Sequence, residues 1–285
     1  MNLVSLNSEF ITDVGLFSWV SRTAQRQFYK RVLGRNHAMK LPSGEIFSLP
    51  IRSHFASEAF ITNANVDWGS ESLLYKLLKN KGSFLDVGAN IGYYSLYMSP
   101  KVKNVYCFEP DYRMLEMLED NLHGREDAYI VNKAVGREPG KASFTLEDSG
   151  EISHLSRDTD DESKSVSVDV VSIDSFVDEH HLTVEAIKTD VEGFDIDVIR
   201  GAVETMRSQR PIVLTECEPN SELFEILSQL HYSVFSFVRK LDRVKPQLMK
   251  ITDELEKTCR TKMLLLLPKE SPVANETVLS QVYLS

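Results

Sequence analysis

The chain has 285 residues, 42% of them hydrophobic and 26% charged, and a formal net charge of -10. This composition supports one large core with an appendage and excludes a disordered or fibrous chain. The acidic balance argues against a general nucleic-acid binder, because binding to phosphates needs a concentrated cationic surface.

Cysteine content and hydropathy indicate a reducing compartment. Cys107, Cys217 and Cys259 are too few and too scattered for a disulfide framework or a zinc motif, so we expect reduced thiols. No apolar stretch approaches the roughly 20 residues that a membrane span needs, and the N-terminus is a poor secretory signal. We therefore expect a cytoplasmic protein without stable membrane insertion.

The N-terminal part predicts one amphipathic helix and one hairpin. Residues 16–33 carry apolar side chains at helical spacing with basic residues between them, and Gly34 is a typical helix end. We favour a helix that caps the main domain; docking on an acidic surface or a membrane is the alternative. Residues 39–53 predict a hairpin with its turn at Pro42-Ser43-Gly44.

From Ser70 onward, helical and strand-like patterns alternate. Further helical patterns lie at residues 91–98, 112–122, 196–206 and 222–230. Short apolar runs, which predict strands, lie at residues 84–87, 105–108, 128–131, 187–189 and 212–215. Strands separated by helices of this length pair in parallel through right-handed crossovers, which predicts an α/β fold.

Two regions depart from this alternation. Residues 142–146 and 166–171 alternate like strands and flank the polar stretch 147–164. Residues 233–238 and 263–267 also predict strands, but no helical pattern returns cleanly between them. They therefore predict an antiparallel pair at the edge of the sheet.

The segment FLDVGANIGYYS, residues 84–95, joins a strand to a helix through two glycines. Gly88 allows a tight turn, and Gly92 allows the helix start to pack close to the strand. Free N–H groups at such a helix start favour an anionic group. A degenerate glycine pattern alone is weak evidence, since tight turns often contain glycine for structural reasons only.

A second feature strengthens the prediction of a ligand site. Glu109 ends the next predicted strand, about 20 residues beyond Asp86, which is the spacing at which an acid reaches ribose hydroxyls. A carboxylate suits two vicinal hydroxyls because it has two acceptor oxygens. The alternative is an exposed Glu ahead of a helix that begins at Pro110 and Asp111.

The residues of the turn favour S-adenosylmethionine as the cofactor. A dinucleotide usually binds a G-x-G-x-x-G pattern, whereas Ala89 and Asn90 follow the first glycine here. The amino-acid end of S-adenosylmethionine presents an ammonium that a carboxylate such as Asp86 can bind.

These stretches resemble the FkbM family of S-adenosylmethionine-dependent methyltransferases over roughly residues 66–267. The resemblance rests on FLDVGANIGYYS, VYCFEPD, NKAVG and IKTDVEGFDIDVIRGA, followed by PIVLTECEP. It implies a class I methyltransferase fold: a Rossmann-like α/β fold with a seven-stranded, mostly parallel sheet and an antiparallel edge strand. A helical and hairpin extension at residues 1–65 would precede a methyltransferase domain at residues 66–285.

The resemblance also implies a reaction and a set of cofactor contacts. The reaction is methyl transfer to a hydroxyl of a sugar, glycolipid or secondary metabolite, with a small-molecule or glycan acceptor. From the acidic net charge we expect no nucleic-acid partner. Related enzymes often have an acid where Lys133 lies, so the adenine contact departs from the family pattern. The implied cofactor-binding residues are Asp86, Gly88, Ala89, Asn90 and Gly92 for the methionine part, Glu109 with Pro110 for the ribose, and Asn132, Lys133 and Ala134 for adenine.

Asp190 and Glu192, in KTDVEG, are the first candidates for catalysis. They follow a predicted parallel strand, at the edge where open α/β sheets bind ligands. Methyl transfer is an in-line displacement, so the protein aligns the acceptor and helps to remove its proton. We rank Asp190 first as the base; orienting the acceptor or the ammonium is its alternative role. Glu192 and Asp195 also suit a helix start.

His154 is the third catalytic candidate. It lies in the polar stretch, where a long loop above the sheet often contacts substrate, and an imidazole titrates near neutrality. The alternative is a surface loop residue. Asp190, Glu192 and Glu216 offer oxygen ligands for magnesium, but no spacing among them requires a metal, so we predict none.

Two other classes of function stay open. A Rossmann-type oxidoreductase would bind reduced nicotinamide, and a non-catalytic methyltransferase-fold module would bind the cofactor without turning over any acceptor. The sequence leaves the oligomeric state and the identity of the acceptor open.

Overall fold

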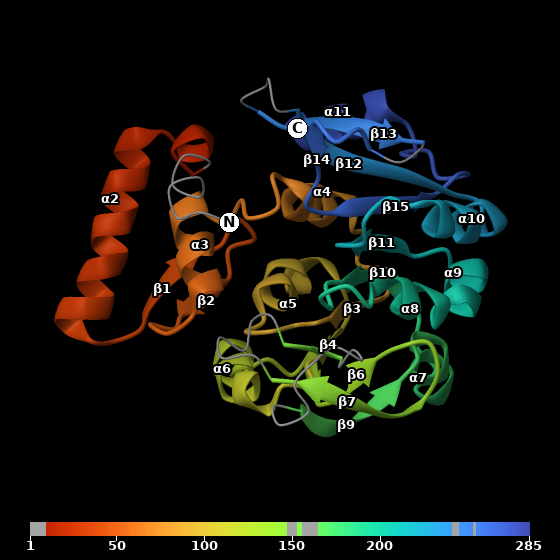
Figure 1. The fold of residues 1–285 in the computed structure, drawn as a ribbon, viewed down its shortest axis with the longest axis horizontal. Helices are drawn as coiled ribbons and strands as arrows, with labels where there is room; N and C mark the ends of the chain where they lie inside the picture. The colour runs from red at the N-terminus through yellow and green to blue at the C-terminus, as the bar shows by residue number, and fades with distance from the viewer. Residues whose placement is uncertain (1–9, 147–152, 156–164, 241–244, 253–254) are drawn as a thin grey trace.

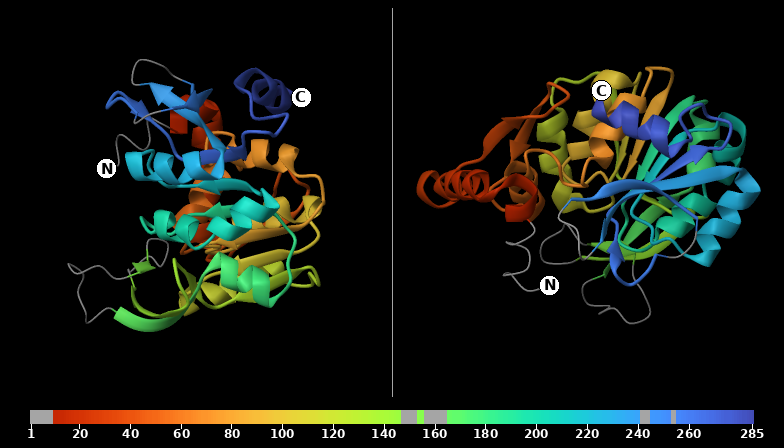
Figure 2. Two further views of the ribbon diagram at one scale, coloured as in Figure 1. Left: turned by 90° about the vertical axis from the view of Figure 1, so that its right-hand side faces the viewer. Right: turned by 90° about the horizontal axis from the view of Figure 1, so that it is seen from above.

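The computed structural model describes residues 10–146, 153–155, 165–240, 245–252 and 255–285. In these residues, helices cover both faces of a central β-sheet, and a helical and hairpin extension lies beside it (Figures 1 and 2). Of the predicted polar stretch, only residues 153–155 belong to the described part.

One half of the central sheet is parallel. Its strands, in spatial order, are β5 (Ala128–Val131), β4 (Val105–Phe108), β3 (Ser83–Val87), β10 (Val184–Thr189) and β11 (Ile212–Thr215). All five strands predicted from the short apolar runs are confirmed, and each neighbouring pair is parallel. Because parallel strands end at one edge, the loops after β3, β4 and β10 meet there.

The other half of the sheet is antiparallel. β15 (Leu264–Pro268) runs against both β11 and β12 (Tyr232–Lys240), so the late pair is antiparallel as predicted, but neither strand lies at the edge of the sheet, where we expected the pair. β15 lies inside the sheet, whereas β13 (Gln247–Ile251) is at the edge, antiparallel to β12. β14 (Cys259–Arg260) pairs with the end of β12.

The described sheet has nine strands, where the resemblance implied seven. The two additional strands both pair with β12. This strand has nine residues and extends beyond the part that pairs with β15. Its other side pairs with β13, and its last two residues pair with β14.

Two hydrophobic clusters cover the two faces of the sheet. In β15, Leu265 and Leu267 belong to the first cluster and Leu264 and Leu266 to the second, as expected for successive residues in a strand. The first cluster packs with α4 (Ser70–Leu77), α5 (Tyr93–Met98), α6 (Tyr112–Leu122) and α11 (Glu276–Leu284). The second packs with α7 (Ile173–Glu179), α8 (Asp195–Arg200), α9 (Val203–Gln209) and α10 (Ser221–Leu230).

The helix predicted over residues 196–206 is two helices, α8 and α9. The break occurs at Gly201 and Ala202. A Cβ added to Gly201 would lie 2.2 Å from the carbonyl oxygen of Gly136. The break therefore coincides with a close approach of two backbones that only glycine allows.

A second, four-stranded sheet forms next to the carboxyl edge of β4. It contains β6 (Ala134–Val135), β9 (Ser165–Val171), β7 (Gly140–Thr145) and β8 (His154–Leu155), in that order. The predicted strands at residues 142–146 and 166–171 are confirmed as β7 and β9, which pair antiparallel.

The extension contains the predicted amphipathic helix. α2 (Leu16–Gln27) continues into the π-helical stretch η1 (Phe28–Leu33), and Gly34 ends it in the left-handed region with φ 58. The predicted hairpin is confirmed as β1 (His37–Lys40) and β2 (Ile46–Leu49). The next helix, α3 (His54–Thr62), was not predicted.

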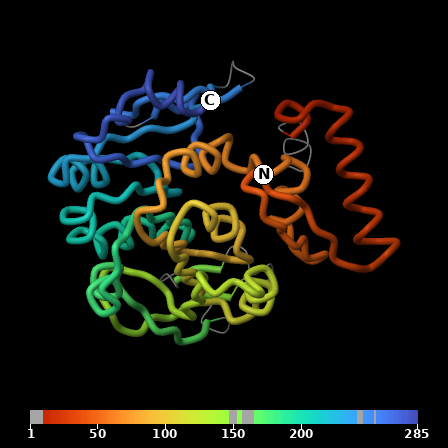
Figure 3. The backbone as a smooth tube through the Cα atoms, turned by 180° about the vertical axis from the view of Figure 1, so that it is seen from behind, coloured from red at the N-terminus to blue at the C-terminus, as the bar shows by residue number. Residues whose placement is uncertain are grey.

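The orientation of α2 differs from our expectation. Figure 3 shows α2 as the outermost element of the extension, and three of its four large apolar side chains, Leu16, Phe17 and Val20, are exposed, whereas Trp19 is half-buried. The helix therefore does not cap the main domain with its apolar side.

Two further sequence predictions are tested by the described residues. No helix in them has the length and apolarity for crossing a bilayer. All three cysteines are free thiols, and Cys107 and Cys217 are buried.

Candidate functional site

A cavity of about 620 Å³ opens at the carboxyl edge of the parallel strands. Its volume lies within the roughly 300–1,000 Å³ typical of small-molecule sites. Of the predicted site residues, those that line it are Gly88, Ala89, Asn90, Glu109, Pro110, Lys133, Ala134, His154, Asp190 and Glu192. The predicted residues outside its lining are Asp86, Gly92 and Asn132.

The glycine turn brings two loops into contact. Gly88 has φ 75, and the N–H groups of Gly88 and Ala89 both donate to the Phe108 carbonyl at 3.0 Å. A Cβ at Gly88 would lie 2.0 Å from the carbonyl oxygen of Asp190. Glycine is therefore needed for the loop after β10 to lie against the loop after β3.

Gly92 has a packing role instead. It precedes α5 with φ 85, and a Cβ there would lie 2.8 Å from Leu118 Cδ1. Gly92 thus lets α5 approach α6 and does not reach the cavity wall.

Glu109 presents a nearly buried carboxylate to the cavity. Its Oε2 accepts a hydrogen bond from the Asn90 N–H and its Oε1 from the Asp111 N–H, both at 2.8 Å. Burial raises the pKa of Glu109 to about 7, although both backbone N–H groups favour the ionised form. Each oxygen keeps a lone pair that can accept from a ligand hydroxyl. The carboxylate is therefore fixed in position and still able to bind.

Asn132 stabilises the turn after β4, which carries Glu109, from outside the cavity. Its Nδ2 donates to the carbonyl oxygens of Glu109 at 2.8 Å and of Pro110 at 3.2 Å. Its side chain is exposed and holds the turn after β4, so the adenine side of the cavity is lined by Lys133 and Ala134 instead.

Lys188, in β10, is a buried cation that sequence reasoning missed. Its Nζ donates to the Gly88 carbonyl at 2.9 Å and lies 3.4 Å from Asp190 Oδ2 and 3.6 Å from Asp86 Oδ1. Burial disfavours its charge, but Asp190 and Asp86 outweigh burial and raise its pKa. The ammonium is therefore charged at neutral pH.

Asp86 is a fully buried partner of Lys188. Its Oδ2 accepts from Ser95 Oγ at 2.6 Å. Burial raises the pKa of Asp86, while Lys188 and Ser95 oppose that rise. Asp86 thus lies behind the cavity wall and contacts it through Lys188.

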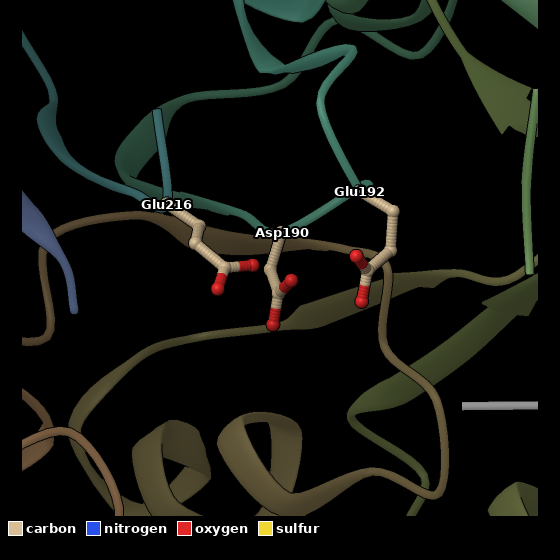
Figure 4. A group of neighbouring side chains, drawn as sticks. All are labelled: Asp190, Glu192 and Glu216. Atoms are coloured by element: carbon tan, nitrogen blue, oxygen red, sulfur yellow. The ribbon is translucent and has the colours of Figure 1, made fainter. Parts of the chain in front are cut away.

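Three carboxylates face one another at the ends of β10 and β11 (Figure 4). Asp190, Glu192 and Glu216 each offer an oxygen, and these three oxygens lie within 4.8 Å of one another. Figure 4 shows Asp190 between the other two side chains. The cluster has cation-ligand chemistry, but Lys188 already balances the charge of Asp190, and carboxylate spacing alone does not establish a metal site.

The pKa values of two acids in this cluster shift in opposite directions. Burial opposes the ionisation of Asp190, but the Lys188 ammonium and a hydrogen bond from Glu216 outweigh it and lower the pKa of Asp190. Partial burial and the neighbouring Asp190 raise the pKa of Glu216. Asp190 is thus an ionised carboxylate at neutral pH and has the chemistry of a proton acceptor.

His154 reaches the same cavity from the second sheet. It lies in β8, opposite Thr145 of β7, and lines the cavity wall. The preceding residue, Ser153, accepts a hydrogen bond from Arg113 Nη2 at 3.0 Å, and Arg113 pairs with Asp111 at 2.6 Å. These contacts tie the polar segment to the start of α6.

The opposite wall holds polar residues that no motif indicated. Tyr94 donates to Asp67 Oδ2 at 2.6 Å, and Lys262 Nζ donates to Glu58 Oε1 at 3.0 Å. All four line the cavity. They come from α3, the loop before α4, α5 and the segment before β15, so only the folded chain brings them together.

The family comparison gives one match by sequence. The model of the methyltransferase FkbM domain matches residues 86–243. No protein among those with curated annotation matches the chain.

Three solved structures that match the chain are distant from it in sequence. Methyltransferase FkbM from Methylobacillus flagellatus KT is 15% identical with a TM-score of 0.42, covering 74% of this chain and 52% of that one. The chain therefore spans about half the length of that protein. An rRNA methylase from Streptococcus thermophilus is 11% identical with a TM-score of 0.36, covering 70% and 93%. Methanocaldococcus jannaschii Trm5, in complex with adenosine, is 12% identical with a TM-score of 0.44, covering 83% and 56%.

Proposed function

The chain belongs to the FkbM methyltransferase family, and from that premise we propose that it transfers a methyl group from S-adenosylmethionine to a hydroxyl of a sugar, glycolipid or secondary metabolite. The observation that carries this proposal is one cavity with Glu109 on one side and the ionised Asp190, paired with Lys188, on another.

The residues around the cavity suit the cofactor. Asn90 Oδ1 is buried without a hydrogen-bond partner among the described residues, which makes it an acceptor for a donor group of a ligand. We propose that Glu109 binds the ribose hydroxyls and that the Gly88–Asn90 loop receives the amino-acid end. Phe108, Ala134 and Val135 supply apolar surface for the adenine beside Lys133.

When bound, S-adenosylmethionine supplies a methyl group on a positively charged sulfur that is a good leaving group. Asp190 would take the proton of the acceptor hydroxyl, because Lys188 keeps this carboxylate ionised. Glu216 would orient Asp190 through their hydrogen bond. Asp86 would act through Lys188, and Glu192 and His154 remain candidates for contacting the acceptor.

The charge of the cavity supports an acceptor without phosphate groups. Acids outnumber lysines in its lining, which contains Glu58, Asp67, Glu109, Asp190, Glu192 and Glu216 against Lys133, Lys188 and Lys262. This lining does not favour an anionic acceptor, whereas its carboxyl oxygens and Tyr94 can hydrogen-bond to hydroxyls. A neutral, hydroxyl-rich small molecule or glycan fits this wall better than a nucleic acid.

Calorimetry tests the proposal. The wild-type protein should bind S-adenosylmethionine and S-adenosylhomocysteine but not NADH. Glu109→Ala should weaken binding of both adenosyl compounds by at least about tenfold, because ribose hydroxyls lose a charged acceptor. Tight binding of NADH would refute the proposal in favour of the oxidoreductase. Cofactor binding with no turnover of any hydroxyl acceptor would favour the non-catalytic module.

A further inference from the structure

The outward side of α2 and η1 carries a cluster of large apolar side chains. Of the ten large apolar side chains that are exposed in the described residues, six lie in this one stretch. Phe17 is 87% exposed. The six are Leu16, Phe17, Val20, Phe28, Val32 and Leu33. Exposed apolar residues occur singly on most proteins, so a cluster on one continuous helix indicates a surface that is covered in function.

The charged residues of α2 lie on its inner side instead. Arg26 is fully buried and donates to the carbonyl oxygens of Leu49 at 2.9 Å and of Pro50, and Arg22 donates to the Phe60 carbonyl at 2.8 Å. Every exposed residue of α2 is uncharged; these are Leu16, Phe17, Val20, Ser21, Ala24, Gln25 and Gln27. A helix that faces water normally has the opposite arrangement, with charge outside and apolar residues inside.

The surroundings of this face are basic, although the chain carries a net charge of -10. No acidic residue occurs between Asp13 and Glu45, whereas four basic residues, Lys30, Arg31, Arg35 and Lys40, occur there besides the two inner arginines of α2. Arg31 and Arg35 are exposed at the end of the stretch, beside Val32 and Leu33. A symmetric contact between two copies would bring this acid-free surface against itself. The surface that complements it is both apolar and anionic.

We propose that α2 and η1 dock the protein peripherally on an anionic lipid bilayer. The six apolar side chains would enter the boundary between headgroups and acyl chains, and Arg31 and Arg35 would lie at the anionic headgroups. α2 packs against α3, whose His54 and Phe55 line the cavity. Docking therefore brings that wall of the cavity near the lipid surface.

Vesicle sedimentation with the full chain tests this docking. Vesicles of phosphatidylcholine mixed with phosphatidylglycerol should sediment the wild-type protein, and phosphatidylcholine alone should sediment it weakly. The double variant Phe17→Glu, Val32→Glu should bind the anionic vesicles at least about tenfold more weakly, because two apolar side chains no longer enter the bilayer. Both side chains are exposed, so the thermal unfolding midpoint should not change.

Leu284→Glu is the matched control. Leu284 is 82% exposed but lies at the end of α11, outside the apolar stretch, so this variant should bind vesicles like the wild type. Failure of the wild type to sediment with anionic vesicles would overturn the proposal, as would unchanged binding by the double variant. A wild-type dimer that the double variant disrupts, without vesicle binding by either, would assign the surface to a second copy.

Discussion

Lys188 sets the charge state of the residues around it. As a buried ammonium between Asp86 and Asp190, it lowers the pKa of Asp190 and keeps this carboxylate ionised, whereas the neighbouring Asp190 raises the pKa of Glu216. Its ammonium also lies 5.4 Å from the centre of the Tyr94 ring, which links the two walls of the cavity. One residue on the central strand β10 therefore keeps the candidate base in its ionised form.

Replacing Asp190 tests this role. Asp190→Asn should lower turnover by about 10²–10⁴-fold, the usual contribution of a general base, because an amide cannot take the acceptor proton. Affinity for S-adenosylmethionine should stay within about twofold, since Lys188 keeps Asp86 as a partner. Calorimetry and single-turnover kinetics with an identified acceptor measure the two effects separately.

The control is Asp178→Asn, which changes an exposed acid in α7 outside the cavity lining and should affect neither quantity. Unchanged turnover in Asp190→Asn would remove Asp190 from the chemistry. A large loss of cofactor affinity would instead make it a ligand of the cofactor ammonium.

Glu109 predicts a pH dependence of cofactor binding. Its pKa is raised by burial to about 7, and ribose hydroxyls donate best to the ionised carboxylate. Affinity should therefore be greatest above pH 7 and fall by about tenfold for each pH unit below it. Calorimetry at pH values on both sides of 7 measures this trend. Glu109→Gln should bind more weakly and lose the trend; affinity that rises on acidification would contradict the role of Glu109.

At the scale of elements, the sequence predicts what periodicity and turn chemistry encode. The five parallel strands, the antiparallel pair β12 and β15, and the helix that ends at Gly34 all follow from patterns within a few residues. Likewise, the loops after β3, β4 and β10 meet because parallel strands share an edge. The same rule places Glu109 and Asp190 at one edge of the sheet, and both line the cavity there.

The missed features depend on contacts between distant segments. In the sequence Lys188 is an ordinary residue of a predicted strand, and only the folded sheet places Asp86 beside it. Glu58 of α3 and Lys262 come from opposite ends of the chain, so no local spacing relates them. The sequence also did not predict that the arginines of α2 face inward and its apolar residues outward. This orientation depends on carbonyl groups of β2 and α3, which accept hydrogen bonds from those arginines.

The contact between the loops after β3 and β10 gives a test at this scale. Gly88→Ala should lower the free energy of unfolding by about 3 kcal/mol, because it adds steric overlap with Asp190 to the strain of a positive φ. Gly124→Ala is the matched control: Gly124 has φ 78 but open space around its Cβ position, so its cost should be about 1 kcal/mol. Denaturant unfolding measures both, and equal losses would contradict the contact.

At the scale of the whole molecule, three parts meet at one edge of the sheet. The parallel half supplies Glu109, Asp190 and Lys188, the second sheet supplies His154, and the extension supplies α3. We predict that residues 1–65 and 66–285 have different functions. Residues 66–285 would bind the cofactor, and the extension would form the part of the cavity that binds the acceptor. Docking of α2 on a lipid surface would orient this edge toward an acceptor held there.

The most direct measurement is a crystal structure with S-adenosylhomocysteine. The account predicts ribose hydroxyls within hydrogen-bond distance of the Glu109 carboxylate, the amino-acid end against the Gly88–Asn90 loop, and the sulfur facing Asp190. Electron density for the ligand elsewhere, or an empty cavity at saturating ligand, would contradict it.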